Sequence, residues 1–335
     1  MREGGILRLS HTIAEDLKEK LPNQRKTQRE NLALLVGTML SVKSPNTVDL
    51  AASLPRKADR LDMRYQWVSR FLSNSHIVPE DIMRPYAKEV LERLTSSGAS
   101  LVLIMDQSKV ASGHEVLMVS VRLRERAIPL MWRVVKTQGE IGYEIQKELL
   151  DVVQSFIPSK AKVVLMGDRF YGTPDLINYC AAQGWDYRLR LKNNLLVEEK
   201  DQGEITTGEL ARLHTKFVEN VFLTKQKVKT NIGFAWESGH PEPWIIAMGA
   251  KPSFYKTMDY GMRWGTENLF SDLKSRGFRL EDSQLKHASR LECLLLIMAL
   301  ALYWAVSTGV WDEVHNPFPY EKKVQIRGLK KLLDG

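Results

Sequence analysis

The chain has 335 residues, of which 44 % are hydrophobic and 26 % charged, and this composition excludes a mainly disordered protein. Its formal net charge of +8 favours a polyanionic partner such as nucleic acid, although charge alone does not select one. The two cysteines, Cys180 and Cys293, form no pair with zinc-ligand spacing and no disulfide framework, which indicates a reducing compartment such as the cytoplasm.

Residues 1–95 are expected to form a helical domain. Apolar residues recur at helical spacing in three segments, 28–40, 47–54 and 63–72. Short helices with tight turns, and with Arg64 and Arg70 left to face a partner, suit a helix-turn-helix-like DNA-binding unit. A small helical bundle with solvated charges is the alternative. The small polar run 95–98 marks the boundary of this domain.

Two unbroken apolar runs, 101–105 and 163–166, have the length of strands and each leads to an aspartate. Fully apolar strands are typical of a parallel sheet that is buried on both faces. If the two strands are parallel neighbours, Asp106 and Asp168 project from the same edge of the sheet, where α/β sheets place their ligands. Two more strands are expected at 115–123 and 127–135, and two helices at 143–156 and 173–183.

Three later segments have distinct patterns. Residues 187–192 alternate as in a half-buried strand, which places Arg188, Arg190 and Lys192 on one face, either as a phosphate-binding stripe or as a solvated face. Residues 195–250 contain strand-like pieces and are interpreted as an insertion. The apolar run 294–306 is shorter than the roughly 20 residues that a membrane span needs, so a buried core helix is expected there.

Residues 260–276 carry the most specific pattern. On a helix with about 100° per residue, Tyr260, Arg263, Glu267 and Lys274 fall within about 60° of arc on one face. An ordinary surface helix with an Arg-Glu pair at four-residue spacing is the alternative reading, and such a pair contributes only a few tenths of a kcal/mol.

The three acids Asp106, Asp168 and Glu267 become more informative when they are taken together. Three carboxylates at one site repel each other and need cations, and Mg²⁺ prefers a few carboxylates with water and phosphate oxygens in its remaining positions. Two such ions suit an in-line displacement at phosphorus. Arg263 and Lys274 could then hold DNA phosphate, and Tyr260 could donate a hydrogen bond to a phosphate or pack beside the DNA strand.

At this point the sequence resembles the DDE-type transposases of bacterial insertion sequences, in particular the insertion sequence four family with its Tyr-x2-Arg-x3-Glu-x6-Lys motif. Tyr260, Arg263, Glu267 and Lys274 match that spacing at every position. The tracts LIMDQS around Asp106 and LMGDRFYG around Asp168 are similar to the first and second aspartate motifs of that family. The tract KSRGFRLEDSQL resembles the sequence that follows its last motif. The resemblance covers roughly residues 28–308.

The resemblance implies an α/β fold with a ribonuclease H-like catalytic core, that is, a mixed sheet with flanking helices. The core is expected at 96–194 and 251–310, a β-rich insertion at 195–250, the N-terminal helical domain at 1–95 and a basic C-terminal tail at 311–335. Asp106, Asp168 and Glu267 are then the catalytic and metal-binding residues. Some relatives stack an insertion tryptophan on a flipped base, for which Trp236 and Trp244 are the candidates, although a core position is the alternative for each.

The function implied is a DNA transposase that nicks transposon ends and transfers the 3′-hydroxyl to target DNA with two Mg²⁺ ions, for which Mn²⁺ can substitute. Its partners are the terminal inverted repeats and target DNA, and synapsis suggests a homodimer on DNA. We expect a cytoplasmic, nucleoid-associated protein without a membrane anchor. Two alternatives stay open: a catalytically silent, domesticated DNA-binding derivative, and a metal-dependent nuclease that does not join ends.

Overall fold

The computed structural model describes residues 3–56, 60–200, 203–214, 216–223, 226–236 and 242–316. Within this part of the chain, the residues before the first strand are helical, as the sequence predicts. The helices are α1 (Glu3–Lys20), α2 (Lys26–Val42), α3 (Thr47–Ser53), α4 (Leu61–Leu72) and α5 (Pro79–Thr95). The polar break before α3 acts as a cap, because the Asn46 side chain accepts a hydrogen bond of 2.9 Å from the backbone N–H of Val48.

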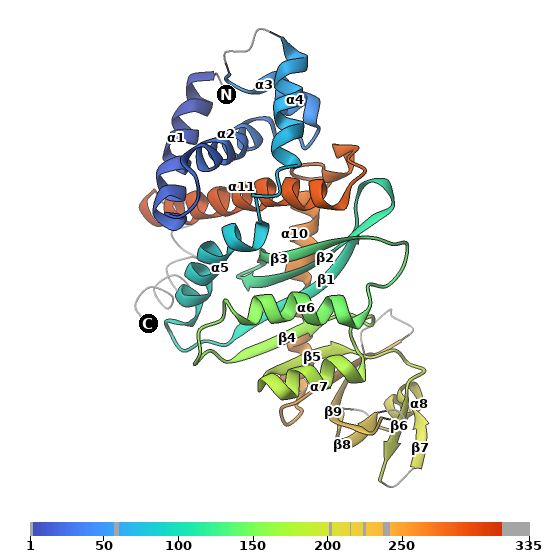
Figure 1. Cartoon of the computed structure of the whole chain (residues 1–335). Coiled ribbons are helices and arrows are strands. Elements are labelled where there is room, and N and C mark those ends of the chain that lie inside the picture. Colours follow the sequence, from blue (N-terminus) through green and yellow to red (C-terminus); the bar gives the residue numbers. More distant parts are fainter. Residues whose placement is uncertain are drawn as a thin grey trace.

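The long helix α11 (Ala288–His315) forms the centre of the molecule. It crosses between the N-terminal helices and the sheet in Figure 1, and it packs against α2, α4, α5 and β3. By length and composition α11 could span a membrane, but its apolar residues from Leu291 to Tyr303 are buried inside this protein. The prediction of a buried core helix over 294–306 is therefore confirmed.

In the described part of the chain, ten strands form one mixed sheet in the order β3-β2-β1-β4-β5-β10-β9-β8-β6-β7. Pairing is parallel between β1 and β4 and between β4 and β5, and antiparallel in the other pairs whose register is resolved. The first five strands in the chain are β1 (Leu101–Lys109), β2 (His114–Leu123), β3 (Arg126–Lys136), β4 (Val163–Gly167) and β5 (Asp186–Arg190). A single turn of 3-10 helix, Ala111–Gly113, connects β1 to β2.

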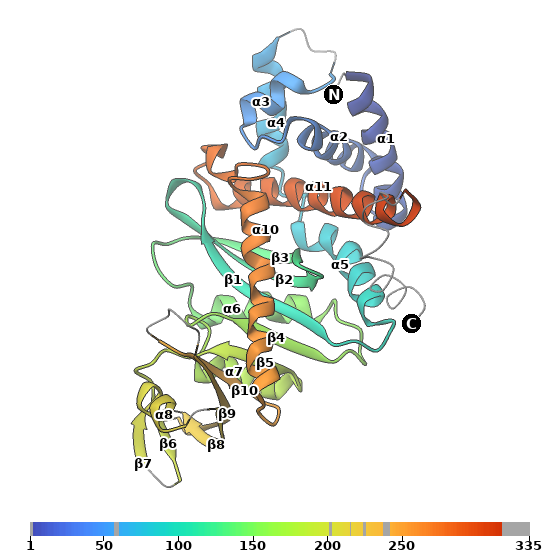
Figure 2. The same cartoon turned by 180° about the vertical axis from the view of Figure 1, so that it is seen from behind.

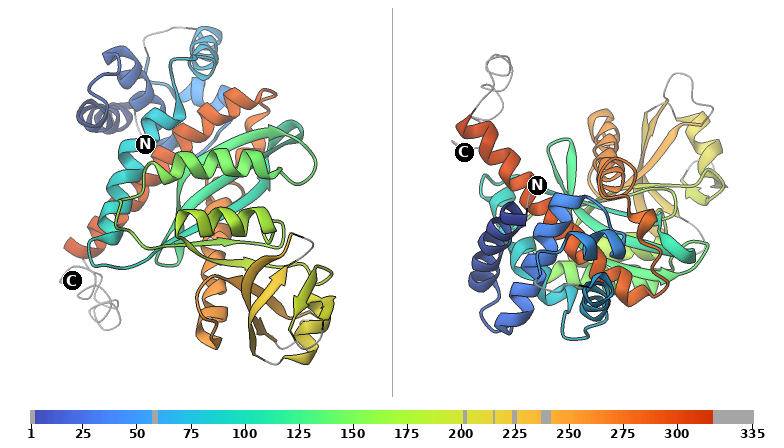
Figure 3. Two further views of the ribbon diagram at one scale, coloured as in Figure 1. Left: turned by 60° about the horizontal axis from the view of Figure 1, so that its bottom comes forward. Right: turned by 90° about the horizontal axis from the view of Figure 1, so that it is seen from above.

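Helices cover both faces of this part of the sheet. The helices α6 (Tyr143–Gln154) and α7 (Pro174–Gln183) lie side by side over one face (Figure 1 and Figure 3, left). Thr173 caps α7 and Pro174 is its first residue, where proline is tolerated. On the opposite face, α10 (Gly265–Leu273) crosses β1, β2 and β3, as the view from behind shows (Figure 2). The chain reaches α10 through α9 (Phe254–Met258) and the 3-10 helix η2 (Asp259–Trp264).

The segment predicted as a β-rich insertion extends the same sheet rather than forming a separate one. It contains β6 (Leu196–Glu199), β7 (Gly203–Thr206), α8 (Thr207–Leu213), β8 (Phe217–Leu223), β9 (Val228–Ala235) and β10 (Trp244–Met248). The last of these, β10, pairs with β5 on one side and with β9 on the other. The insertion is thus hydrogen-bonded to β5, which in turn pairs with β4, the strand that leads to Asp168.

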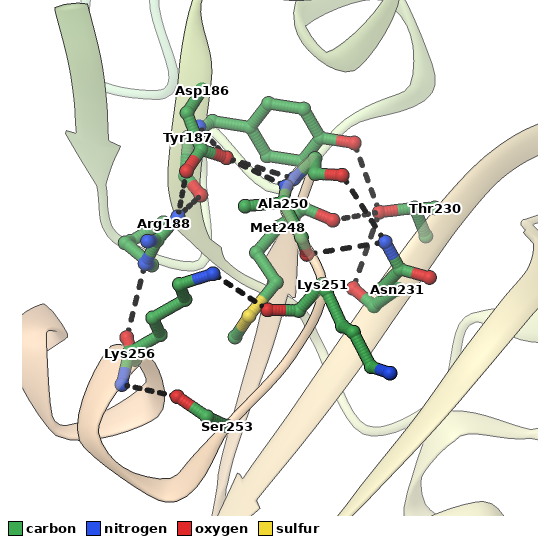
Figure 4. A network of polar contacts seen from close by, with 11 residues as sticks. Asp186, Tyr187, Arg188, Thr230, Asn231, Met248, Ala250, Lys251, Ser253 and Lys256 are labelled. Carbon is green, nitrogen blue, oxygen red and sulfur yellow. Dashed lines mark hydrogen bonds and ion pairs between the residues drawn. The ribbon is translucent and has the colours of Figure 1, made fainter.

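A buried polar network fastens this junction (Figure 4). The Asp186 carboxylate at the start of β5 accepts hydrogen bonds from the backbone N–H groups of Tyr187, Gly249 and Ala250 and pairs with Arg188 at 2.8 Å. Burial alone would raise the pKa of Asp186, but Arg188 and these backbone donors hold it below its usual range. The charged network therefore fixes the segment after β10 against β5.

The structure bears on two predictions about the C-terminal part of the chain. The helix α11 continues to His315, five residues past the expected end of the core at 310. Most of the basic tail expected at 311–335 lies outside the described residues, which end at residue 316.

Candidate active site

The two aspartates lie at equivalent positions on neighbouring parallel strands. The register between β1 and β4 ends with Met105 opposite Gly167. Asp106 directly follows Met105, and Asp168 directly follows Gly167. Adjacent strands are about 5 Å apart, so both carboxylates start from one edge of the sheet. The prediction that these strands are parallel neighbours is confirmed. One detail differs: β4 ends before Asp168, whereas β1 continues through Asp106 to Lys109 because β2 pairs with it along that stretch.

The loop after Asp168 is folded tightly beneath the site. The Asp168 carboxylate accepts a hydrogen bond of 2.8 Å from the backbone N–H of Phe170, and the Asp168 carbonyl accepts one of 3.0 Å from Tyr171. The Tyr171 ring is fully buried, and its hydroxyl has no hydrogen-bond partner among the residues that the structure describes. Burial raises the pKa of Tyr171, and Asp106 and Asp168 add to the shift, which places this phenol close to both acids.

Arg263 connects the third acid to the first. Its guanidinium donates one hydrogen bond of 2.9 Å from Nη1 to Oδ2 of Asp106 and another of 2.8 Å from Nη2 to Oε1 of Glu267. Arg263 stands in η2 and Glu267 in the first turn of α10. The side chains of Arg263 and Asp106 are each 13 % exposed, whereas that of Glu267 is 59 % exposed. The structure thus brings all three acids to one place, with a cation between two of them.

The continuous helix expected over 260–276 is interrupted at both ends. Residues 259–264 form a 3-10 helix, and α10 ends at Leu273, so that Lys274 is its C-cap with φ of −102° and ψ of −115°. The Lys274 ammonium lies 3.4 Å from a carboxylate oxygen of Glu281 and does not contact the three acids. The prediction that Arg263 and Glu267 share a face is confirmed. The prediction that one continuous helix also carries Lys274 on this face is wrong, because the backbone leaves helical geometry at that residue.

The electrostatics of the site favour the binding of positive charge. Burial raises the pKa of Asp106 to about 7; Arg263 opposes this rise, and Asp168 and Glu267 add to it. Burial alone would lower the pKa of the Arg263 guanidinium, but Tyr260, Asp106 and Glu267 outweigh it and raise that pKa. The charges of Asp168 and Glu267 therefore make Asp106 harder to ionise unless a cation compensates them.

The donor set matches the chemistry of a hard divalent cation, since it consists of carboxylate oxygens alone. Within the described residues, however, no three His, Cys, Asp or Glu side chains are close enough together to form a ready-made metal cage. The Arg263 guanidinium occupies the space between Asp106 and Glu267. The residues fit a hard divalent cation in composition, and a change in the Arg263 bridge is needed before the three carboxylates can close around one.

An aromatic cluster borders the acids on the insertion side. Tyr260 is buried, with its ring 5.2 Å from that of Trp244 and 5.8 Å from the Arg263 guanidinium. Trp244 is 8 % exposed and therefore part of the core, while Trp236 is 55 % exposed. Trp264 packs edge-on against Trp244 at 5.9 Å, is 49 % exposed and directly follows Arg263. Trp264 was not predicted as a site residue, although its place inside the Tyr-Arg-Glu-Lys tract was a usable signal.

A small basic cleft of about 210 Å³ begins at the residue after Asp168. Arg190 and Lys192, both predicted from the sequence, line it together with Arg169, which was not predicted. The Lys192 ammonium lies 5.6 Å from the centre of the Phe170 ring. A larger cleft of about 540 Å³ lies between the β2–β3 turn and the second half of α11, but it contains none of the three acids. The basic lining next to the acids is the better match to a polyanion.

Arg188 does not belong to the predicted basic stripe, because it is buried. It is 3 % exposed, and its guanidinium donates to the Lys256 carbonyl at 3.0 Å and to the carboxylate of Asp186 at 2.8 Å (Figure 4). The alternation of 187–192 placed it on the same open face as Arg190 and Lys192. That part of the prediction is wrong, because the chain after β10 folds back over Arg188 and uses it inside the protein.

The two N-terminal arginines differ in their surroundings. Arg64 is half-buried, and its guanidinium donates to the backbone carbonyls of Ala52 and Leu54 at 3.2 and 3.4 Å, where it satisfies the C-terminal end of α3. Arg70 is exposed in the last turn of α4. Of the two, Arg70 is therefore the one whose charge is open to a partner.

Comparison with known proteins is informative about the catalytic region. Residues 146–304, just under half of the chain, match the family model described as Transposase DDE domain. The matched region includes Asp168 and Glu267 and begins after Asp106. No curated protein matches the chain. The mixed α/β sheet with its helices is compatible with a ribonuclease H-like transposase fold. The match supports a transposase with a DDE domain, a family of enzymes that cleave or join DNA.

Proposed function

We propose that this chain is a transposase of the insertion sequence four group that nicks transposon ends and transfers the resulting 3′-hydroxyl to target DNA. Asp106, Asp168 and Glu267 act as the catalytic and metal-binding residues. The observation that carries the proposal is the register of Asp106 and Asp168, together with the 2.9 and 2.8 Å contacts that hold Glu267 to Asp106 through Arg263. Three independent elements converge on one site, and two of them lie inside the matched family region.

The site residues have separate tasks in the proposed reaction. Asp106, Asp168 and Glu267 hold two Mg²⁺ ions, or Mn²⁺ in their place. When bound, such ions activate the attacking oxygen and stabilise the leaving oxygen of an in-line displacement. Asp106 and Asp168 supply ligands from a rigid sheet edge, which fixes their spacing. Glu267 supplies its ligand from a partly exposed helix turn and can adjust to the substrate.

DNA is proposed to lie along the acids and the adjoining basic cleft. Arg190 and Lys192 are placed to contact phosphates next to Asp168, and Arg169 extends the same surface. Arg263 and Lys274 contribute further positive charge around Glu267, and Tyr260 supports Arg263 through its ring. Exposure favours Trp264 and Trp236 over the buried Trp244 as platforms for an unstacked base.

The remaining parts are assigned by the same proposal. Residues 1–95 bind DNA through exposed groups such as Arg70, residues 195–250 form the β-rich insertion, and 311–335 form a basic tail. The protein pairs two transposon ends as a homodimer on DNA and associates with the nucleoid. Because the insertion continues the catalytic sheet, its DNA contacts can reach the aspartate-bearing strands through β5, which pairs with both β10 and β4.

Joining is the step that separates a transposase from a nuclease, and a strand-transfer assay tests it. The substrate is a duplex that carries the inverted repeat flanking the gene, already cut to expose a 3′-hydroxyl, with supercoiled plasmid as target and Mg²⁺ as the metal. We expect covalent joined products with the wild-type chain, and none from an otherwise identical end that terminates in a 3′-deoxynucleotide. Cleavage of uncut ends without joining of pre-cut ends would identify a nuclease, and binding without either reaction would identify a silent derivative.

A further inference from the structure

The Arg263 guanidinium occupies the oxygens that a metal ion at this site requires. It contacts Oδ2 of Asp106 at 2.9 Å and Oε1 of Glu267 at 2.8 Å. Both oxygens belong to the proposed metal ligands. Because a divalent cation close to the guanidinium would meet a like charge, the bridge and a metal ion compete for the same two carboxylates.

The Arg263 bridge leaves part of the guanidinium unsatisfied. Its Nε–H is buried and has no acceptor among the described residues, although the two terminal nitrogens are both paired. A buried donor without a partner costs free energy. The arrangement is thus stable enough to neutralise two carboxylates but does not use every donor of the side chain. An incoming group with several acceptor oxygens can offer more.

A DNA phosphate is such a group. The planar guanidinium matches phosphate geometry with two parallel hydrogen bonds, and it binds phosphate more readily than a compact ammonium does. The neighbouring Lys274 is already paired with Glu281 and is not part of the bridge. Tyr260, against which the guanidinium rests at 5.8 Å, is buried and can support the side chain at either position.

We infer that Arg263 acts as a stand-in cation in the metal-free protein and that a DNA phosphate draws it off Asp106 and Glu267, which admits the metal ions only when DNA is bound. This inference rests on the proposed function and adds that DNA binds before the metal ions. Binding of DNA and binding of metal then favour each other, since each ligand stabilises the arrangement in which Arg263 has left Asp106 and Glu267. By linkage, the two ligands must raise each other's affinity by the same factor.

The experiment measures Mn²⁺ affinity of the full-length protein by electron paramagnetic resonance, with and without a duplex. The duplex carries the flanking inverted repeat and ends in a 3′-deoxynucleotide, so that no strand can be transferred. For the wild-type chain we expect DNA to tighten Mn²⁺ binding by about 5- to 150-fold, the usual range of such coupling. For Arg263→Gln we expect Mn²⁺ affinity without DNA to rise about tenfold and the further gain on adding DNA to disappear.

Arg126→Gln is the matched control, because Arg126 also pairs with a carboxylate of α10, Asp272, away from the three acids. Its Mn²⁺ affinity should equal that of the wild type. If Arg263→Gln fails to fold, Arg263→Lys replaces it. One ammonium cannot span both carboxylates, so Mn²⁺ affinity without DNA is again expected to rise, but by a smaller factor.

Equal or weaker Mn²⁺ binding by the Arg263 variant without DNA overturns the inference. It does so while leaving the proposed function intact if the wild-type chain still cleaves DNA with Mg²⁺. Absence of Mn²⁺ binding and of metal-dependent cleavage in the wild-type chain overturns both. These two results distinguish failure of the proposed Arg263 displacement from failure of the active-site assignment.

Discussion

Replacing Asp106 with Asn is expected to reduce Mg²⁺-dependent nicking of transposon ends by roughly 1,000-fold or more. A catalytic metal ion contributes several kcal/mol of transition-state stabilisation, and each 1.4 kcal/mol or so corresponds to a factor of ten in rate. Asp106 provides a ligand from the rigid edge of β1, in register with Asp168 on β4, and no neighbouring side chain can replace it from that strand. Single-turnover nicking of an end-labelled duplex measures the effect.

The same substitution should leave the metal-free fold intact. Burial raises the pKa of Asp106 to about 7, which lowers the free-energy cost of replacing its carboxylate with the neutral amide of Asn, a side chain of the same shape. We expect the free energy of unfolding to change by about 1 kcal/mol or less. Asp175→Asn, an exposed acid in the first turn of α7, serves as the matched control and should retain nicking. Full activity of the Asp106 variant would contradict the assignment, whereas unfolding of the variant would contradict the expected stability of the metal-free fold.

Gly172→Ala is expected to destabilise the protein by about 1–3 kcal/mol, the usual cost of overpacking, or by more if β5 cannot shift. A Cβ atom at Gly172 would fall well inside van der Waals contact with the backbone carbonyl of Arg190. Neither side can yield easily, since Gly172 ends the tight loop after Asp168 and Arg190 ends a strand paired on both sides. Urea denaturation followed by circular dichroism measures the loss.

Gly142→Ala is the control for the glycine substitution, because a Cβ at that position meets no atom within 4 Å. It should lower the free energy of unfolding by about 1 kcal/mol or less, because Gly142 is the N-cap of α6, where Ala is less favourable than Gly. The Gly172 variant should also nick DNA more slowly at temperatures where it remains folded, since the loop positions Asp168. Unchanged stability of this variant would show that the loop and β5 are not packed as closely as the structure has them.

Local patterns predicted the parts of the fold that are determined locally. The apolar runs before Asp106 and Asp168 specify buried strands, and parallel pairing then aligns the two acids without further information. The four-residue spacing of Arg263 and Glu267 predicted their contact in the same way. These features depend on periodicity and on nearest neighbours along the chain.

Features that depend on distant segments were missed or misread. Arg188 alternates with buried residues as a solvent-facing side chain would, but the carbonyl of Lys256, 68 positions later, meets it inside the protein. Lys274 fits the helical spacing, but the helix ends one residue before it. The contact of Arg263 with Asp106 spans 157 positions, and no sequence pattern indicates it. Tertiary contacts between elements decide such cases.

The central claim is that Asp106, Asp168 and Glu267 hold metal ions on the scissile phosphate, and sulfur substitution at that phosphate tests it most directly. Replacing one non-bridging oxygen with sulfur weakens the contact to Mg²⁺, which prefers oxygen, more than the contact to the softer Mn²⁺. For one of the two phosphorothioate isomers, we predict slow cleavage in Mg²⁺ and recovery in Mn²⁺, with no cleavage by Asp106→Asn in either metal. Equal inhibition in both metals, or cleavage that needs no metal, would contradict the account.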